Sequence, residues 1–169
     1  GSEFSPSQIN LPELLNFCKE NEGQKESLEK VIKDCYFANH GNGSEKNRRT
    51  LAMNCRLGLK AYGIIDDECK LTDFGRLLYS IHQNDELLYQ TLARHILLNL
   101  NGMGFVQCMK DMEIALEKIT LQTMRSALEI RGITYPNGGK HPSIMRLWLA
   151  KAGVFPPKGY TVNDERLKE

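Results

Sequence analysis

The chain of 169 residues has no long apolar run, no strong excess of charge of one sign and no closely paired cysteines. A membrane-spanning helix needs roughly 20 consecutive apolar residues, and a secretory leader needs a basic segment followed by an apolar one; the sequence has neither. Its formal net charge is +1, so no global field draws it onto nucleic acid or an anionic membrane. We therefore expect no membrane partner, and binding to a polyanion would need a local cluster of basic residues.

Cysteines and histidines are too few and too scattered for a disulfide framework or a zinc site. The five cysteines are an odd number without a C-x-x-C pair, and several fall on apolar faces of predicted helices. This pattern predicts buried free thiols in a reducing, cytoplasmic compartment, and no metal site. The cysteines are Cys18, Cys35, Cys55, Cys69 and Cys108.

Complete catalytic motifs are also missing. Asp67-Glu68-Cys69-Lys70 contains the E-x-K part of a nuclease signature, but no upstream acidic strand residue completes it. Asp73-Phe74-Gly75 matches a kinase tripeptide without the glycine-rich loop or catalytic loop that kinases need. Gly138-Gly139-Lys140 lacks the remainder of a phosphate-binding loop. We expect no catalytic residue and no cofactor.

Two ten-residue stretches resemble each other. RLGLKAYGII begins at Arg56 and RLWLAKAGVF begins at Arg146, ninety positions later. Both read Arg-Leu-x-Leu-x-x-x-Gly, followed by an aliphatic residue and a large apolar one. The similarity suggests one structural unit used twice.

The order of the predicted helices supports that interpretation. Apolar periodicity and capping signals predict helices starting near residues 11, 27 and 45, and again near 105, 120 and 142. Asn10, Thr72 and Thr120 are the predicted N-caps of three helices, and Gly63 is the predicted end of another. Each third helix leads into an apolar pair, which predicts a short hairpin at 63–72 and a short strand at 160–162.

Three helices followed by a hairpin describe the winged variant of the helix-turn-helix. The sequence therefore predicts a mainly α protein with two winged-helix units and short β-hairpin wings, joined by linking helices. We place the first unit at 5–82, a linking helix at 83–104 and the second unit at 105–169. The first four residues, 1–4, have the appearance of a cloning scar, and with the charged last residues they suggest an excised domain.

The segment LKAYGIIDDECKLTDFGRLL, Leu59 to Leu78, resembles the winged-helix family: a helix, a glycine with two aliphatic residues, a short hairpin, LT-x-x-G and a new helix. The tandem arrangement also looks like the DNA-recognition regions of some bacterial restriction endonucleases. That resemblance implies a non-catalytic module that reads double-stranded DNA within a larger bacterial restriction or defence protein at the nucleoid.

The third helix of each predicted unit supplies the candidate DNA contacts. Between Ser44 and Lys60 there are five basic residues and one acidic residue, and arginine and asparagine suit bidentate contacts with base edges. The second unit has three basic residues and no acid between Gly138 and Lys151. The candidates are Lys46, Asn47, Arg48, Arg49, Thr50, Asn54, Arg56 and Lys60 in the first unit, and Lys140, His141, Ser143 and Arg146 in the second.

One acidic segment opposes this interpretation. Asp66-Asp67-Glu68 would form the tip of the first wing and would repel a phosphate backbone. The alternative is a protein-interaction or oligomerisation module that binds other domains of the same chain or a protein partner.

Overall fold

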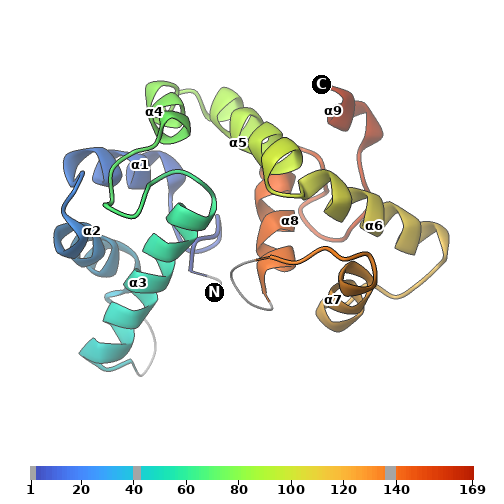
Figure 1. The fold of residues 1–169 in the computed structure, drawn as a ribbon, viewed down its shortest axis with the longest axis horizontal. Coiled ribbons are helices and arrows are strands. Elements are labelled where there is room, and N and C mark those ends of the chain that lie inside the picture. Colours follow the sequence, from blue (N-terminus) through green and yellow to red (C-terminus); the bar gives the residue numbers. More distant parts are fainter. Residues whose placement is uncertain (1–2, 40–42, 136–139) are drawn as a thin grey trace. The chain divides into compact units, whose positions relative to one another are not determined.

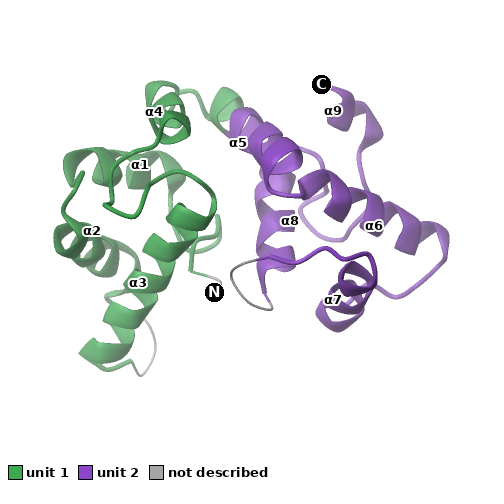
Figure 2. Cartoon of the chain, viewed as in Figure 1, with its two compact units in different colours: residues 1–88 green, residues 89–169 purple. Residues whose placement is uncertain are grey.

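Helices form the regular secondary structure of residues 3–39, 43–135 and 140–169, which are the residues described in this computed structural model (Figure 1). The chain divides into two units, residues 1–88 and 89–169, and the division falls inside α5 (Asp85–Asn99) (Figure 2). Most of α5, the predicted linking helix, thus belongs to unit 2. Among the described residues, no helix is long and apolar enough to span a membrane.

Unit 1 contains α1 (Leu11–Glu20), α2 (Lys25–Ile32), α3 (Glu45–Ala61) and α4 (Asp73–Ser80). The predicted caps are confirmed: the side chain of Asn10 accepts from the Glu13 backbone N–H at 3.0 Å, and Thr72 accepts from Gly75 N–H at 3.0 Å. α2 contacts both α1 and α3, so the three helices share one core. That core is formed by Leu11, Leu14, Leu15, Cys18, Leu28, Ile32, Phe37, Cys55 and Leu59, all fully buried.

Phe4 also belongs to this core, although residues 1–4 were left out of the predicted fold. Its side chain is 2% exposed, and its ring meets that of Tyr62 edge-on with 5.2 Å between the ring centroids. The Cβ of Phe4 lies so close to Gly58 that a side chain on Gly58 would collide with it at 2.5 Å. Position 58 must therefore stay without a side chain for Phe4 to pack there.

Unit 2 repeats the order of three helices with α6 (Gly102–Ile114), α7 (Leu121–Ile130) and α8 (His141–Lys151). α7 contacts both of the others, and the predicted cap Thr120 forms a capping box with Thr123. A short α9 (Asp164–Lys168) follows. The buried side chains include Phe105, Met109, Met124, Met145, Trp148, Leu149 and Phe155.

The third helix of each unit ends in the same hydrogen-bond pattern. Gly63 has φ +78° and Gly153 has φ +86°, a left-handed conformation that favours glycine. After Gly63, the N–H of Ile64 donates to the carbonyl of Leu59 at 3.0 Å; after Gly153, Val154 donates to Leu149 at 3.0 Å. This is the Schellman motif, in which the aliphatic residue after the glycine packs back on the helix. It accounts for the shared L-x-x-x-G-aliphatic pattern.

The predicted β-hairpin wings are wrong, because the described residues contain no β-strand. In the first unit only one antiparallel bridge forms, between Ile65 and Leu71. The Asp66 carboxylate closes the intervening loop tightly, accepting from the backbone N–H groups of Glu68 and Lys70 at 2.9 and 3.0 Å. Thr72 then starts α4 at once, so no residues remain to extend a ladder.

In unit 2 the predicted strand at 160–162 is likewise not a strand. It follows Pro156 and Pro157, and proline has no backbone N–H to donate to a ladder. One backbone bond, from Asn163 N–H to the Val154 carbonyl at 2.8 Å, ties this segment to the end of α8. The fold is thus mainly α, as predicted, but the winged-helix assignment is not supported.

The predicted free thiols are confirmed, because all five cysteines are unbonded and four are buried. Cys35 is the exception and is exposed, although the apolar spacing that starts at Leu28 predicts it on the buried face of the second helix. A π-helical turn, Lys33–Phe37, follows α2 and shifts the register there. Tyr36 in this turn donates to the Glu13 carboxylate at 2.7 Å, and Phe37 enters the core.

Candidate nucleic-acid interface

The exposed face of α3 carries five of the eight residues that were predicted to bind DNA in the first unit. Lys46, Arg49, Thr50, Met53, Leu57 and Lys60 are exposed and recur at helical spacing along it. The opposite face, with Ala52, Cys55 and Leu59, is fully buried in unit 1. Because the packed face holds the helix, the exposed side chains are free of any role in the core.

The first turn of α3 is fixed by its cap. The Ser44 hydroxyl accepts from the backbone N–H of Asn47 at 3.2 Å, and Thr50 donates to the Lys46 carbonyl at 3.0 Å. The one acid in this turn, Glu45, is bound by Lys33 from the π-helical turn, which lowers the pKa of the Glu45 carboxyl. Glu45 is therefore ionised and largely neutralised, while Lys46, Asn47 and Arg49 are exposed beside it.

Arg48 and Asn54 lie at the edge of this face. The Arg48 guanidinium turns back and donates to the Gly43 carbonyl at 2.8 Å, with Glu45 at 3.8 Å. It thus contacts Gly43, two residues before the start of α3, and is half-buried, as is Asn54. Both are less exposed than Lys46 and Arg49.

Arg56 is not part of the exposed face. Its side chain is 9% exposed, and its Nε lies 2.6 Å from Oε2 of Glu29 on α2. Helical spacing predicts Arg56 on one exposed stripe with Arg49 and Met53, but in the structure the Arg56 side chain points toward Glu29 of α2. This arginine joins α2 to α3 and is removed from the candidate DNA surface.

Lys60, at the other end of the exposed face, is paired with Asp67 of the acidic loop. The hydrogen bond from Lys60 lowers the pKa of the Asp67 carboxyl. The acidic loop thus neutralises the C-terminal end of α3 and leaves the free positive charge at its N-terminal end. The acidic loop therefore pairs with Lys60 at the C-terminal end of α3 and does not neutralise the basic side chains at its N-terminal end.

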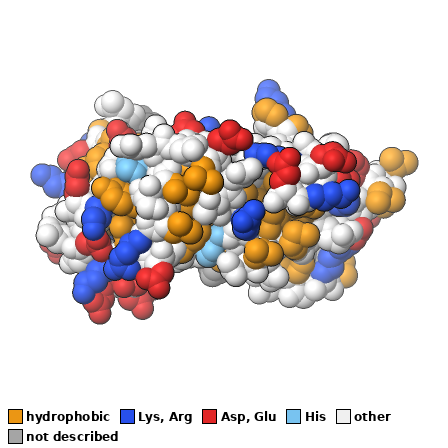
Figure 3. Space-filling model, turned by 90° about the horizontal axis from the view of Figure 1, so that it is seen from above, with side chains coloured by type: hydrophobic (Ala, Val, Ile, Leu, Met, Phe, Trp, Pro, Cys, Tyr) orange, Lys and Arg blue, Asp and Glu red, His pale blue; other side chains and the backbone are white. Residues whose placement is uncertain are grey.

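Positive charge is concentrated around the start of α3. Residues 29–56 contain six basic and three acidic side chains, a net charge of +3, whereas the whole chain carries +1. The remaining residues therefore carry a net charge of −2. No wide patch of one sign appears on the face shown in Figure 3, where acidic and basic side chains alternate. The cluster at α3 is local.

In unit 2, few of the residues predicted to bind DNA are exposed at α8. Lys140 is exposed and Ser143 half-buried, but His141 is 5% exposed and stacks on Tyr135 with 4.7 Å between the ring centroids. Burial lowers the pKa of His141 from 6.5 to about 4, so the imidazole is neutral at pH 7. A neutral, buried imidazole has no positive charge to attract a phosphate.

Arg146 serves the fold of unit 2. Its Nη1 donates to the carbonyls of Pro156 at 3.1 Å and Gly159 at 3.2 Å, and its guanidinium lies 5.4 Å from the centroid of the Tyr160 ring. These contacts hold the two-proline turn against α8. The arginines that begin the two similar stretches, Arg56 and Arg146, are therefore both structural, and each fixes a different neighbour.

The buried imidazole gives unit 2 a pH-dependent stability. The unfolded chain takes up a proton near pH 6.5 that folded His141 does not take up until about pH 4. The free energy of unfolding should therefore fall as the pH drops from 6.5 to 4, by on the order of 3 kcal/mol from this group. Urea titrations followed by Trp148 fluorescence at about pH 7 and about pH 5 should show a smaller fall in His141→Phe than in the wild type. Equal falls in the two proteins would contradict the assignment.

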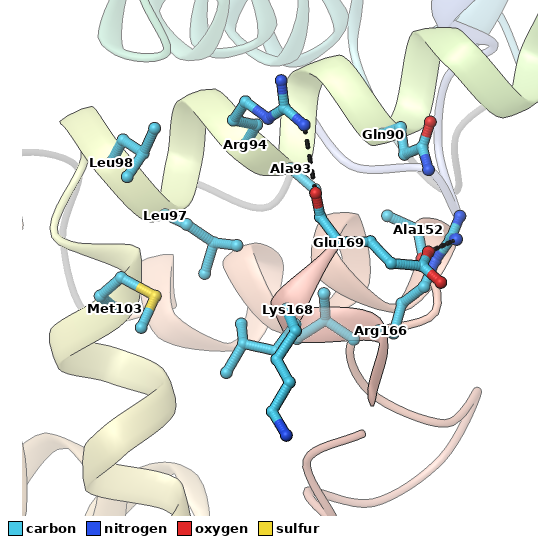
Figure 4. A pocket seen from close by; sticks show the side chains of 12 residues that line it. Gln90, Ala93, Arg94, Leu97, Leu98, Met103, Ala152, Arg166, Lys168 and Glu169 are labelled. Carbon is cyan, nitrogen blue, oxygen red and sulfur yellow. Dashed lines mark hydrogen bonds and ion pairs between the residues drawn. The ribbon is translucent and has the colours of Figure 1, made fainter. Parts of the chain in front are cut away.

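A cavity of about 190 Å³ in unit 2 is a second candidate site (Figure 4). Leu97, Leu98 and Met103 form an apolar wall at one side of it. Its arginines are used by the chain itself: Arg94 donates to the Glu169 carbonyl at 3.2 Å, and Arg166 donates to the Ala152 carbonyl at 2.7 Å. Both guanidinium groups thus tie α9 and Glu169 to the rest of unit 2.

Comparison with protein-family models, with curated proteins and with solved structures finds no match to the chain. A functional assignment therefore depends on the residues and their geometry. Among the described residues, no group of three or more histidine, cysteine or acidic side chains is arranged to hold a metal ion. The exposed face of α3 is the best-defined candidate site.

Proposed function

We propose that the chain binds double-stranded DNA through the N-terminal half of α3. The observation that carries the proposal is the set of adjacent exposed side chains Lys46, Asn47, Arg49 and Thr50, in a segment whose only acid, Glu45, is neutralised by Lys33. Cations attract phosphates, and asparagine and arginine can read base edges. A helix fits the major groove, so all four can reach one duplex.

The apolar part of the same face adds to this proposal. Met53 and Leu57 are each 37% exposed and continue the exposed line of α3 beyond Thr50. An apolar side chain in the major groove can contact the methyl group of thymine, whereas lysine and arginine contact phosphates or guanine. Helical spacing from Arg49 predicts Met53 on the exposed stripe, although it was not a candidate contact, and Leu57 was not predicted from the sequence at all. Their exposure, within an otherwise amphipathic helix, is the signal that identifies them.

The test is the salt dependence of duplex binding in the variant Lys46→Ala/Arg49→Ala. Each phosphate contact contributes about 0.9 to the slope of log affinity against log salt, so losing two contacts should reduce the slope by about 2. Affinity at low salt should fall by roughly tenfold or more. The measurement is fluorescence anisotropy with a labelled duplex of mixed sequence across a series of salt concentrations.

The matched control is Lys25→Ala/Arg76→Ala, which removes one lysine and one arginine from exposed positions on two other helices of unit 1, α2 and α4. Its total charge equals that of the test variant, so a general charge effect would appear equally in both. The proposal predicts a wild-type slope for the control. Equal losses in the two variants, or no duplex binding by the wild type at low salt, would rule out a specific α3 interface.

A further inference from the structure

The cavity of unit 2 joins an apolar wall to basic side chains (Figure 4). It is lined by residues of α5, the start of α6, the segment after α8 and α9, so the described lining residues all belong to unit 2. An apolar cavity of roughly 150 Å³ is large enough to hold a benzene ring. With a volume of about 190 Å³, this cavity has room for an apolar group of that size.

The apolar wall comes from two helices. Leu97 and Leu98 belong to α5, and Met103 is the second residue of α6. Leu98 is 71% exposed and Met103 45%, so both lie at the mouth of the cavity. Val154, which the Schellman motif holds at the end of α8, also lines the cavity and is buried. The cavity therefore offers apolar surface from its mouth inward.

Arg94 lies beside this wall and is the residue that can bind a charged group. It precedes Leu97 and Leu98 by three and four positions in α5, so the three side chains share one face of the helix. Its Nη2 donates to the Glu169 carbonyl at 3.2 Å, which shows where an oxygen acceptor lies against the guanidinium. A guanidinium has five N–H donors, so Arg94 can bind a carboxylate while it keeps this contact.

The charge around the cavity favours an anion. Of the described residues that line it, Arg94, Arg166 and Lys168 are basic and Glu169 is acidic. The Glu169 carboxylate is paired with Arg166, so it adds little repulsion toward a second carboxylate. A neutral apolar ligand would make no use of Arg94, and a small inorganic anion would leave the apolar wall in contact with water. The complementary ligand carries one carboxylate and an apolar body.

We propose that this cavity binds a small carboxylic acid whose apolar body has about six carbon atoms, an aromatic acid of the size of benzoate. The carboxylate pairs with Arg94, and the apolar body contacts Leu97 and Met103. This inference goes beyond DNA binding and does not depend on it, since the cavity belongs to unit 2 and α3 to unit 1.

Titration of the isotope-labelled whole chain with benzoate, followed by amide chemical shifts at constant ionic strength, tests the proposal. We expect saturable shifts at the amides of α5 and α9, with a dissociation constant on the order of 1 mM for so small a ligand. Acetate has the charge without the apolar body, and benzyl alcohol has the apolar body without the charge. Each should bind at least about tenfold more weakly than benzoate.

Two variants assign the binding to named residues. Arg94→Gln should weaken benzoate binding by about tenfold, because the charge-assisted pair is lost. Leu97→Gln should weaken it by about fivefold, because the apolar wall is reduced while Arg94 stays in place. The matched control is Arg76→Gln, which removes an exposed arginine from α4 of unit 1 and should bind benzoate as the wild type does.

Three results would overturn the proposal. The first is a wild type whose amide shifts show no saturation up to about 20 mM benzoate. The second is acetate or benzyl alcohol binding as tightly as benzoate, and the third is wild-type affinity in either cavity variant. The amide spectra also report folding. If Arg94→Gln loosened α9, the Leu97→Gln variant and the two comparison ligands would still decide the outcome.

Discussion

Alanine at Arg56 is expected to lower the free energy of unfolding of unit 1 by about 3 kcal/mol. The Arg56 side chain is 9% exposed, and it is the cation that balances Glu29, whose side chain is itself only 23% exposed. Without Arg56, the Glu29 carboxylate stays partly buried and loses the cation that compensates its lost hydration. The cost therefore comes mainly from the carboxylate left behind.

A variant that removes both charges separates the loss of the ion pair from the cost of leaving the Glu29 carboxylate unpaired. Glu29→Gln/Arg56→Met should be close to wild-type stability, because no uncompensated charge remains and methionine keeps much of the packed volume. Hydrogen exchange of the α2 and α3 amides measures the change in unit 1, while Trp148 fluorescence reports unit 2 separately. If Arg56→Ala kept wild-type protection but lost duplex affinity, Arg56 would be a DNA contact and its structural role would be refuted.

Alanine at Gly75 is expected to be similarly damaging, at about 3 kcal/mol. Gly75 lies in α4, and a Cβ there would stand 2.1 Å from the backbone carbonyl oxygen of Ile64 and 3.0 Å from the side chain of Leu71. The same carbonyl accepts from the Thr72 hydroxyl at 3.2 Å and from the Thr72 backbone N–H at 3.1 Å, so moving it would break two hydrogen bonds at the start of α4. The better helix propensity of alanine offsets only about 1 kcal/mol of such a collision.

Gly132→Ala is the matched control for this second prediction. Gly132 has φ +72°, and a methyl group added there would have no other atom within 4 Å. Its substitution therefore costs only the left-handed backbone strain, about 1 kcal/mol. Urea denaturation followed by circular dichroism should rank Gly75→Ala well below Gly132→Ala in stability. The reverse order would show that the close approach of α4 to Ile64 is not maintained.

Helix order and helix ends could be predicted from the sequence because both depend on local chemistry. Apolar periodicity placed the starts of α1 and α3, and the side chains of Asn10, Thr72 and Thr120 gave the caps that the structure has. The tight loop in place of the first wing could not be foreseen. An apolar pair before a turn looks the same in a hairpin and in a tight loop, and the loop at Asp66 depends on side-chain hydrogen bonds.

The similarity between the stretches at Arg56 and Arg146 does not by itself indicate a repeated structural unit. Their common L-x-x-x-G-aliphatic part also occurs at the end of α7, where Gly132 has φ +72° and Ile133 N–H donates to the Leu128 carbonyl at 2.9 Å. It is the signature of a Schellman helix end wherever one is needed. The residues of the candidate site were harder to predict than the helix ends, because the sequence does not distinguish an arginine bound to Glu29 from one exposed on α3.

Contact between duplex DNA and the N-terminal half of α3 can be measured amide by amide. The decisive experiment is hydrogen exchange of the wild-type chain, with and without a saturating duplex at low salt. We expect slower exchange at the amides from Ser44 to Thr50 when the duplex is bound, and unchanged exchange in α7. Binding that leaves the start of α3 unprotected and protects another segment would contradict the proposed interface.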